Sequence, residues 1–251
     1  MAADSFELGG KVALVTGGSR GLGREMVRSF AAAGADVVIA SRKLDACEDL
    51  AREVRDSYGR RAVAIACHVG RWAEVDALVE RTYAEVGRVD VLVNNAGMSP
   101  LYPTPVDVSE DLWDKVVAVN LKGPFRLTAL VADRMAGGVG GSVINISSTA
   151  SIRPTADSIP YAAAKAGLNA ITVAFAHAYG PKVRVNCIAP GPILTDVSKA
   201  WDPDGADAQA SSFALRRLGQ PHEIIGAALY FASDASSFTT GAVLRVDGGH
   251  P

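Results

Sequence analysis

The chain has few cysteines, no long apolar run and no marked excess of charge of one sign. Its three cysteines, Cys47, Cys67 and Cys187, lie far apart in a sequence of 251 residues. An odd number without close spacing argues against a disulfide framework and is typical of a reducing compartment, so we expect a cytoplasmic protein. The four histidines show no metal-ligand spacing, and we expect no metal site.

Membrane and nucleic-acid partners are disfavoured in the same way. There is no run of about 18 apolar residues, as a transmembrane helix requires. Residues 1–7 lack the basic start and apolar core of a secretory signal. The formal net charge is −2, and basic residues never run beyond pairs such as Arg60 and Arg61. We therefore expect neither a nucleic acid nor a membrane as partner.

Apolar runs of strand length alternate with helical periodicity along a chain that is 49% hydrophobic and 21% charged, an ordinary globular composition. No composition shift or linker marks a second domain, so residues 1–251 are predicted to form one. Strands that are apolar on both faces and alternate with helices indicate an α/β fold, with a parallel sheet covered on both sides. Strands are predicted at about 11–16, 37–40, 62–66, 89–93, 142–146, 182–188 and 242–246, and helices at about 22–33, 44–54, 75–86, 109–135 and 160–179.

One stretch, from Pro190 to about Arg217, breaks the alternation. It is rich in proline, glycine, aspartate and serine. We interpret it as a loop with short helical pieces that acts as a substrate loop or lid.

Glycines follow the first predicted strand, with the spacing Gly17, Gly21 and Gly23. In open parallel sheets ligands bind outside the carboxyl ends of strands. Glycines there let the backbone approach a pyrophosphate, and the following helix supplies N–H donors and the positive end of its dipole. The alternative is a tight turn without a ligand. We predict a dinucleotide site.

The residues at the end of the second predicted strand indicate which dinucleotide the site binds. An acidic residue there would bind the ribose 2′-hydroxyl and repel a 2′-phosphate. The chain instead has Ser41, Arg42 and Lys43, and Arg20 lies in the glycine loop. Arginine matches phosphate geometry with two parallel hydrogen bonds, so NADP(H) is predicted over NAD(H). The alternative for Arg42 and Lys43 is a solvated start of a helix.

Tyr161 and Lys165 stand four residues apart and share one face of a predicted helix. A phenol titrates near about 10, and an ammonium group beside it lowers that pKa, giving a proton donor and acceptor usable near neutral pH. Ser148, which follows the fifth predicted strand, is placed to donate a hydrogen bond to a substrate carbonyl. Asn120 interrupts a predicted helix, where asparagine is normally neutral or unfavourable; the alternative is an exposed surface residue.

Together these motifs make the chain resemble the classical short-chain dehydrogenase/reductase family. The resemblance covers essentially the whole chain in the family's usual order. It implies a Rossmann-type, doubly wound parallel sheet of about seven strands in one domain. The motifs are Thr16-Gly17 with Gly21-Leu22-Gly23, Asn94-Asn95-Ala96-Gly97, Asn120, Ser148, Tyr161 with Lys165, Pro190-Gly191 and Val246-Asp247-Gly248-Gly249.

The resemblance also implies roles. Asn120, Ser148, Tyr161 and Lys165 would form a catalytic tetrad: serine polarises the carbonyl, tyrosine is the general acid or base, lysine binds the nicotinamide ribose and lowers the tyrosine pKa, and asparagine holds a water of the proton relay. Family members are usually homotetramers or dimers. The cofactor-binding positions would be Gly17, Ser19, Arg20, Gly21, Leu22, Gly23, Ser41, Arg42, Lys43, His68, Val69, Asn94, Ala96, Gly97, Tyr161, Lys165, Pro190, Gly191, Ile193 and Thr195.

The chain departs from the family pattern after the third predicted strand. The family commonly has an aspartate there, near the adenine amino group, where this chain has His68-Val69. A neutral imidazole nitrogen can still accept that hydrogen bond. The alternative is that His68 only packs at the end of the strand.

The substrate pocket is expected from loops that follow the fourth, fifth and sixth strands. Ser148 and Tyr161 would contact the reacting oxygen, and Leu101, Ile152 and Trp201 would line an apolar wall, with Met98, Tyr102, Ile159, Leu194 and Phe213 as further candidates. This favours a moderately hydrophobic ketone or secondary alcohol. We predict an NADP(H)-dependent oxidoreductase, similar to 3-oxoacyl reductases or related carbonyl reductases. The alternatives are an NAD-linked secondary-alcohol or sugar-alcohol dehydrogenase and a non-catalytic dinucleotide-binding regulatory protein.

Overall fold

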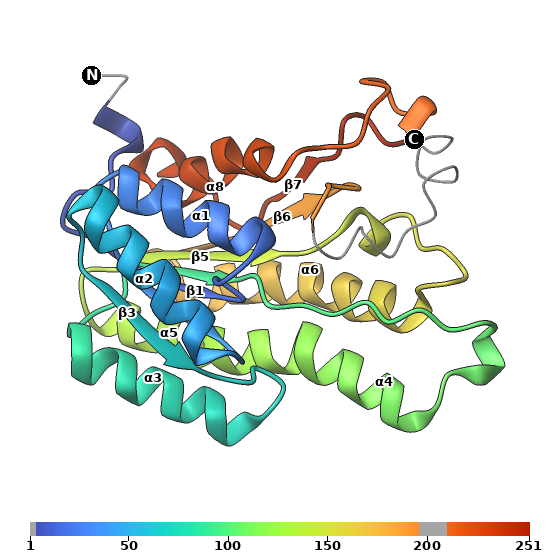
Figure 1. Cartoon of the computed structure of the whole chain (residues 1–251), viewed down its shortest axis with the longest axis horizontal. Coiled ribbons are helices and arrows are strands. Elements are labelled where there is room, and N and C mark those ends of the chain that lie inside the picture. The colour runs from blue at the N-terminus through green and yellow to red at the C-terminus, as the bar shows by residue number, and fades with distance from the viewer. Residues whose placement is uncertain (1–3, 196–209) are drawn as a thin grey trace.

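The strands pair in parallel in the order β3-β2-β1-β4-β5-β6-β7 in the computed structural model, which describes residues 4–195 and 210–251 (Figure 1). This confirms the predicted seven-stranded doubly wound sheet. The strands are β1 (Val12–Thr16), β2 (Asp36–Ser41), β3 (Ala62–Ala66), β4 (Val91–Asn94), β5 (Gly141–Ile146), β6 (Val183–Pro190) and β7 (Val243–Val246).

Helices cover both faces of the sheet, because its central strands are apolar on both faces. All five residues of β1 are buried: Ala13 and Val15 pack into one hydrophobic cluster, while Val12 and Leu14 pack into the other. The first cluster lies under α1, α2 and α8 and the second under α3, α5 and α6 (Figure 1). The helices are α1 (Gly21–Ala32), α2 (Leu44–Tyr58), α3 (Trp72–Val86), α4 (Glu110–Val117), α5 (Gly123–Gly137), α6 (Ile159–Tyr179) and α8 (Ile225–Ala232).

The direction of winding changes at β1. This strand pairs with β2 on one side and with β4 on the other, so the segments that leave the two neighbours diverge. A crevice at the carboxyl ends of such strands is the usual ligand position in an open α/β sheet. The chain segments after β1, β2, β3, β4 and β5 therefore form one edge of the molecule, and the predicted site residues lie on them.

Three elements differ from the sequence prediction. The predicted helix at 109–135 consists of α4, a π-helical turn (Ala118–Lys122) and α5. Helix α8 was not predicted at all. Strand β6 continues to Pro190, which is paired with Val246, so the predicted loop begins one residue later.

The described ends of that loop are tied together. Leu194 N donates to Gly219 O at 2.9 Å, and Gly219 N donates to Pro192 O at 3.0 Å. Residues 196–209, including the predicted substrate residue Trp201, lie outside the described residues. Within the described ranges, no helix has the length and apolar character needed to cross a membrane.

Candidate active site

The glycine loop between β1 and α1 packs closely against the segment that follows β4. Gly17 has a φ of +62°, and a Cβ there would lie 2.9 Å from Ala96 Cα. A Cβ on Gly23 would lie 2.3 Å from Gly17 O. Only glycine fits at these two positions, and the backbone N–H groups at the start of α1 are left facing the crevice. This cradle fits a dinucleotide pyrophosphate.

Asn95 clamps this loop, a role that the sequence analysis did not assign. Its Nδ2 donates to Thr16 O at 2.9 Å and to Gly17 O at 3.1 Å. Thr16 Oγ1 in turn accepts from Asn95 N at 3.1 Å and from Ala96 N at 3.2 Å. The motif Asn94-Asn95-Ala96-Gly97 was the available signal, but the partners of Asn95 lie some 80 residues earlier in the chain.

Asn94 has its side chain on the other side of the backbone. It is 2% exposed, and its Nδ2 donates to Thr128 Oγ1 at 2.9 Å and to Asn145 Oδ1 at 2.8 Å. Asn145 Nδ2 in turn donates to Thr172 Oγ1 at 2.8 Å. This buried network joins β4, β5, α5 and α6, so any contact of Asn94 with a cofactor would have to come from its backbone.

The expected 2′-phosphate site lies where β1 and β2 end. Ser19 Oγ donates to Ser41 Oγ at 2.9 Å, which joins the glycine loop to the end of β2. Arg20 and Arg42, the next residue after each serine, are therefore on adjoining loops. Both are exposed, as is Lys43, and none of the three side chains pairs with an acidic residue within the described part of the chain. Two unpaired guanidinium groups here fit a phosphate.

His68, after β3, has a fixed tautomer. Gly70 N donates to His68 Nδ1 at 3.2 Å, so the neutral ring carries its proton on Nε2. Glu74 Oε2 holds the backbone by accepting from His68 N at 2.7 Å. The ring thus presents a donor, and the expectation that it accepts a hydrogen bond from the adenine amino group is wrong for this ring orientation. Val69 is 8% exposed and packs in the core.

Asn120 lies in the π-helical turn and is fully buried, which rules out the exposed alternative. Its Oδ1 accepts from Met98 N at 3.2 Å, and its Nδ2 donates to Met98 O at 2.8 Å and Val116 O at 2.9 Å. A Cβ on Gly97 would lie 3.0 Å from Asn120 Oδ1 and 3.7 Å from Lys165 Nζ. Gly97 therefore lies between two members of the predicted tetrad. Single π turns inside α-helices occur often at functional sites.

Ser148 and Tyr161 are brought together at the carboxyl end of β5. Ser148 Oγ accepts from Ala150 N at 3.2 Å, which leaves the hydroxyl proton free for another acceptor. Burial raises the pKa of the Tyr161 phenol, and a side-chain hydrogen bond with Ser148 opposes that increase.

Lys165 lies one helical turn along α6 from Tyr161. Its Nζ is 5.6 Å from the centre of the tyrosine ring and donates to Ile146 O at 2.6 Å. The residue is 3% exposed, and burial lowers the pKa of its ammonium group to about 8. Burial thus shifts the pKa of the phenol upward and the pKa of the ammonium downward, and the lowering of the tyrosine pKa by Lys165 stays a prediction.

The segment after β6 reaches back to the glycine loop. Thr195 Cβ would be 3.7 Å from a Cβ on Gly21, and Ile193 is 7% exposed. Gly191 packs on Asp247, where a Cβ would lie 2.7 Å from Asp247 Cβ. The structure therefore places the predicted cofactor-binding segment after β6 opposite the start of α1.

The substrate-wall candidates divide into two groups. Leu101 and Ile152 are 64% and 47% exposed, so both present apolar surface at the rim of the site. Tyr102 is instead structural, since its hydroxyl donates to Ala156 O at 3.0 Å and accepts from Ile159 N at 2.6 Å. Phe213 is 2% exposed and packs inside.

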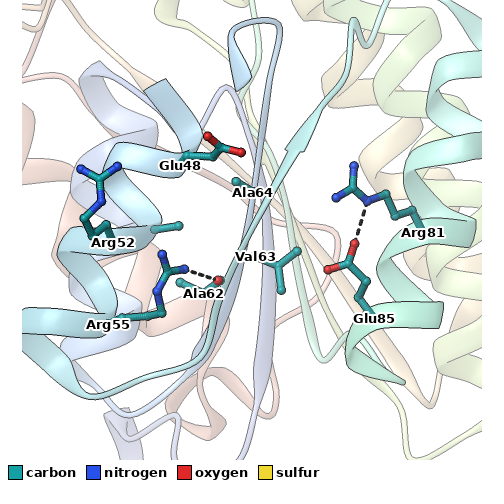
Figure 2. Close-up of a pocket in the computed structure, with 9 residues that line it drawn as sticks. Glu48, Arg52, Arg55, Ala62, Val63, Ala64, Arg81 and Glu85 are labelled. Carbon is teal, nitrogen blue, oxygen red and sulfur yellow. Dashed lines mark hydrogen bonds and ion pairs between the residues drawn. The ribbon is translucent and has the colours of Figure 1, made fainter. Parts of the chain in front are cut away.

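The surface has hollows near α4 and near β3. One, of about 350 Å³, lies between the start of α4 and the start of α6 and includes Trp113 and Ile159. The other, of about 380 Å³, lies along the outer edge of β3, between α2 and α3 (Figure 2). In the second, Arg81 pairs with Glu85 at 2.7 Å and Arg55 donates to Ala62 O at 2.9 Å. It borders the amino half of β3 and takes no part in the site.

No group of three or more histidine, cysteine or acidic side chains in residues 4–195 and 210–251 is placed to hold a metal ion. The candidate site thus consists of a glycine cradle, two free arginines, and a buried lysine beside a tyrosine and a serine. This set suits a nicotinamide dinucleotide and a proton transfer to or from an oxygen atom.

Comparison with known proteins points in the same direction. A family model described as enoyl-(acyl carrier protein) reductase matches residues 17–250. D-threitol dehydrogenase of Mycolicibacterium smegmatis is 36% identical over 247 residues, which cover 98% of this chain and 94% of that protein.

Solved structures agree along nearly the whole chain. A gluconate 5-dehydrogenase from Burkholderia cenocepacia in complex with NADP and tartrate superposes with a TM-score of 0.94 at 36% identity, covering 99% of this chain and 98% of the other. A 7α-hydroxysteroid dehydrogenase complexed with NADH and 7-oxoglycochenodeoxycholic acid also has a TM-score of 0.94 at 36% identity, covering 99% and 97%.

Proposed function

Because the chain belongs to the short-chain dehydrogenase/reductase family, we propose that it is an NADP(H)-dependent enzyme that interconverts a ketone and a secondary alcohol. Membership makes it an NAD(P)-dependent oxidoreductase that acts on CH–OH groups. The roles of single residues, the preferred dinucleotide and the class of substrate are the parts that we propose.

One observation carries the proposal: Ser148, Tyr161 and Lys165 converge where β5 ends and α6 begins, beside Gly97 and the glycine loop. When bound, the nicotinamide ring supplies or accepts the hydride. Tyr161 gives its proton to the carbonyl oxygen in reduction and takes it back in oxidation. Ser148 Oγ donates to the same oxygen, which stabilises the charge that develops there.

Lys165 and Asn120 act around this pair. The ammonium of Lys165, now bonded to Ile146 O, lies close to Gly97 and would be in reach of a ribose hydroxyl on the crevice side. Asn120 is held by Met98 and Val116, and the second lone pair of its Oδ1 is the place for a relay water. Both side chains are buried, so they are held in place before any ligand binds.

Tyr161→Phe tests the mechanism. It removes the proton donor but leaves the ring, so turnover should fall by about 10²–10⁴-fold. Cofactor affinity, measured by quenching of NADPH fluorescence, should change little. A fully active Tyr161→Phe enzyme would show that the proton comes from another group, and the proposal would be withdrawn.

NADP(H) preference is supported by Arg20 and Arg42, which have no acidic partner among the described residues, and by the absence of an acidic residue at Ser41–Lys43. The NAD-linked alternative is kept open by the 7α-hydroxysteroid dehydrogenase complexed with NADH. The two are separated by kcat/KM for NADPH and NADH with one ketone. Equal values, or a higher value for NADH, would contradict the preference.

For the substrate, we infer a moderately hydrophobic ketone or its alcohol. The exposed apolar side chains of Leu101 and Ile152 support this, and the relatives include a 3-oxoacyl-[acyl-carrier-protein] reductase from Chlamydia trachomatis. The alternative of a sugar alcohol is favoured by the resemblance to D-threitol dehydrogenase. Absorbance at about 340 nm over a panel of ketones, acyl thioesters and polyols distinguishes these classes.

A homotetramer or dimer is also part of the proposal. Trp72 and Phe125 are each 42% exposed and pack together, with ring centres 6.4 Å apart, on the face formed by α3 and α5. Exposed aromatic pairs of this kind are typical of protein interfaces. Light scattering after size exclusion measures the mass directly. A cytoplasmic location stays a prediction from the cysteine content.

A further inference from the structure

Helix α6 carries a third polar residue on the same side as the reacting pair. Tyr161, Lys165 and Asn169 follow one another at intervals of four, which places them along one stripe of the helix. Asn169 is partly buried and belongs to none of the motifs from which the site was predicted. It does not reach Tyr161, but it is connected to Ser148 by hydrogen bonds.

The connection runs through the short helical turn that follows Ser148. Asn169 Nδ2 donates to Ser151 Oγ at 2.8 Å, and Ser151 Oγ donates to Ser148 O at 2.6 Å. Ser151 N donates to the same carbonyl at 3.0 Å. Behind the amide, Cys187 Sγ on β6 donates to Asn169 Oδ1 at 3.4 Å. The chain thus joins β6, α6 and the turn that carries Ser148.

The donors and acceptors among Asn169, Ser151 and Ser148 follow from their chemistry. A hydroxyl has one proton, and Ser151 gives it to Ser148 O, so Ser151 Oγ must accept from the Asn169 amide. The other end of that amide is then an acceptor and needs a donor. Burial raises the pKa of the Cys187 thiol to about 11, so the thiol keeps its proton at neutral pH and remains a donor.

We propose that Asn169 is a positioning residue for Ser148: by locking the hydroxyl of Ser151, it fixes the carbonyl, and hence the side-chain direction, of the serine that meets the substrate oxygen. This inference rests on the function proposed above. Ser148 Oγ already accepts from Ala150 N in the same turn, so a shift of the turn would move that hydroxyl away from Tyr161. An error of about 1 Å at a reacting group can cost up to about a hundredfold in rate.

The test compares Asn169→Leu, Ser151→Ala and the double variant with the unaltered enzyme. Asn169→Leu keeps the volume and removes the donor. Each single variant should lower kcat by roughly tenfold, with the Kd for NADPH unchanged, because the cofactor cradle is not involved. The double variant should lose little more than either single one, since both changes break the same chain.

The pH profile supplies a readout that a merely structural residue would not change. The hydrogen bond with Ser148 lowers the pKa of Tyr161, so misplacing Ser148 should raise it. In alcohol oxidation, where Tyr161 acts as base, the rising limb of kcat/KM should move to higher pH.

Tyr179→Phe is the matched control on the same helix. It removes a hydroxyl that donates to Ala129 O at 3.2 Å, outside the Ser148 chain. It should lower Tm without moving the pH profile. If Asn169→Leu does not fold, the test rests on Ser151→Ala. This variant removes the hydrogen bond from Ser151 Oγ to Ser148 O, and Ser151 is only half-buried.

Each result has a definite meaning. Full kcat and an unmoved pH limb in the Asn169→Leu or Ser151→Ala enzyme would overturn the positioning role while the proposed function stands, provided that Tyr161→Phe is inactive. Additive losses in the double variant would also overturn it. A fully active Tyr161→Phe enzyme would overturn both proposals.

Discussion

Lys165, a residue with a proposed catalytic role, lowers the stability of the folded chain. The residue is 3% exposed, and within the described residues its ammonium donates to Ile146 O alone, so burial lowers its pKa to about 8 from the usual value near 10.5. A cation that is harder to protonate in the folded than in the unfolded chain opposes folding. The spacing of Tyr161 and Lys165 predicted that the two would meet, but spacing says nothing about how deeply they are buried.

We expect Lys165→Met to abolish turnover and to stabilise the cofactor-free protein at pH 7. Methionine fills a similar volume without a charge, and replacing buried ionic groups by apolar ones often raises stability by about 1–4 kcal/mol. The sign follows from the lowered pKa: the cost of the lysine is fully present below about pH 8, and it disappears as the pH rises toward the unfolded value near 10.5. Urea unfolding at several pH values measures the difference.

The advantage of Lys165→Met should therefore be largest at or below about pH 7 and should shrink above about pH 8. Lys43→Met, at an exposed position, is the control and should show no such dependence. A Lys165→Met protein that is less stable than the parent at every pH would mean that the bond to Ile146 outweighs the cost of burial.

At His68 the structure has a hydrogen-bond donor where an acceptor was expected. Nδ1 accepts from Gly70 N, so the neutral ring has a donor at Nε2, where the family commonly has a carboxylate. We expect the enzyme to bind the hypoxanthine analogue of NADPH almost as well as NADPH, because the 6-oxo group of hypoxanthine accepts a hydrogen bond. In His68→Asp the analogue should bind roughly tenfold more weakly than NADPH, since a carboxylate repels that oxygen.

Fluorescence titration gives the two dissociation constants for each protein, without turnover. The informative quantity is their ratio, so a general loss of affinity in His68→Asp cancels. The same ratio in both proteins would show that His68 only packs at the end of β3, the alternative left open by the sequence.

At the scale of elements, periodicity predicted the long segments and failed on a short one. Strands β1 to β7 were found because each is an apolar run bounded by turns. Helix α8 has eight residues, Ile225–Ala232, nearly all apolar, so it shows neither a polar face nor a length that separates helix from strand. The π turn around Asn120 was visible only as an asparagine in a helical pattern, since one extra residue in a turn leaves no compositional trace.

The start of α6 gives a prediction at this scale. Tyr102 OH accepts from Ile159 N, the first residue of α6, and donates to Ala156 O, so one phenol pins the helix two residues before Tyr161. Tyr102→Phe should lower stability by about 1–2 kcal/mol, because it leaves a backbone donor and an acceptor unpaired. It should also lower kcat severalfold through a less fixed Tyr161.

Tyr58→Phe is the matched control, since Tyr58 lies at the end of α2 and its phenol makes no hydrogen bond within the described residues. Thermal unfolding and steady-state kinetics on both variants give the comparison. Equal effects of Tyr102→Phe and Tyr58→Phe on kcat would contradict the anchoring role.

At the scale of the whole molecule, the site depends on topology more than on any motif. The parallel order brings the segments after five strands to one edge, and residues as distant as Gly17 and Ser148 lie on those segments. That Asn120 belongs with Ser148 was predicted from the family resemblance alone. The clamp of Asn95 on Thr16 and the chain from Asn169 to Ser148 were not predicted. Both depend on side-chain contacts between elements, and a single sequence carries no signal for such pairs.

The same topology brings the loops that carry Arg20 and Arg42 together at the ends of β1 and β2, and cofactor binding there should stabilise the fold. A ligand at about 100 times its Kd adds about 2.7 kcal/mol to the free energy of unfolding. For a chain of this size that corresponds to roughly 5–10 °C in Tm. Arg42→Ala should weaken NADPH binding about tenfold or more, because it removes a charge-assisted contact to the 2′-phosphate. At a fixed NADPH concentration the Tm gain should then fall by about 3–5 °C.

NADH has no 2′-phosphate, so the Tm gain that it produces should be the same in Arg42→Ala as in the parent protein. Arg52→Ala serves as control, because Arg52 is an exposed arginine of α2 paired with Asp49 at 3.2 Å, away from the ends of β1 and β2. Arg52→Ala should change neither the Tm gain produced by NADPH nor the gain produced by NADH. If Arg42→Ala reduces the effects of NADPH and NADH equally, the arginine supports the dinucleotide site as a whole, and the preference for NADP(H) must come from another residue or be absent.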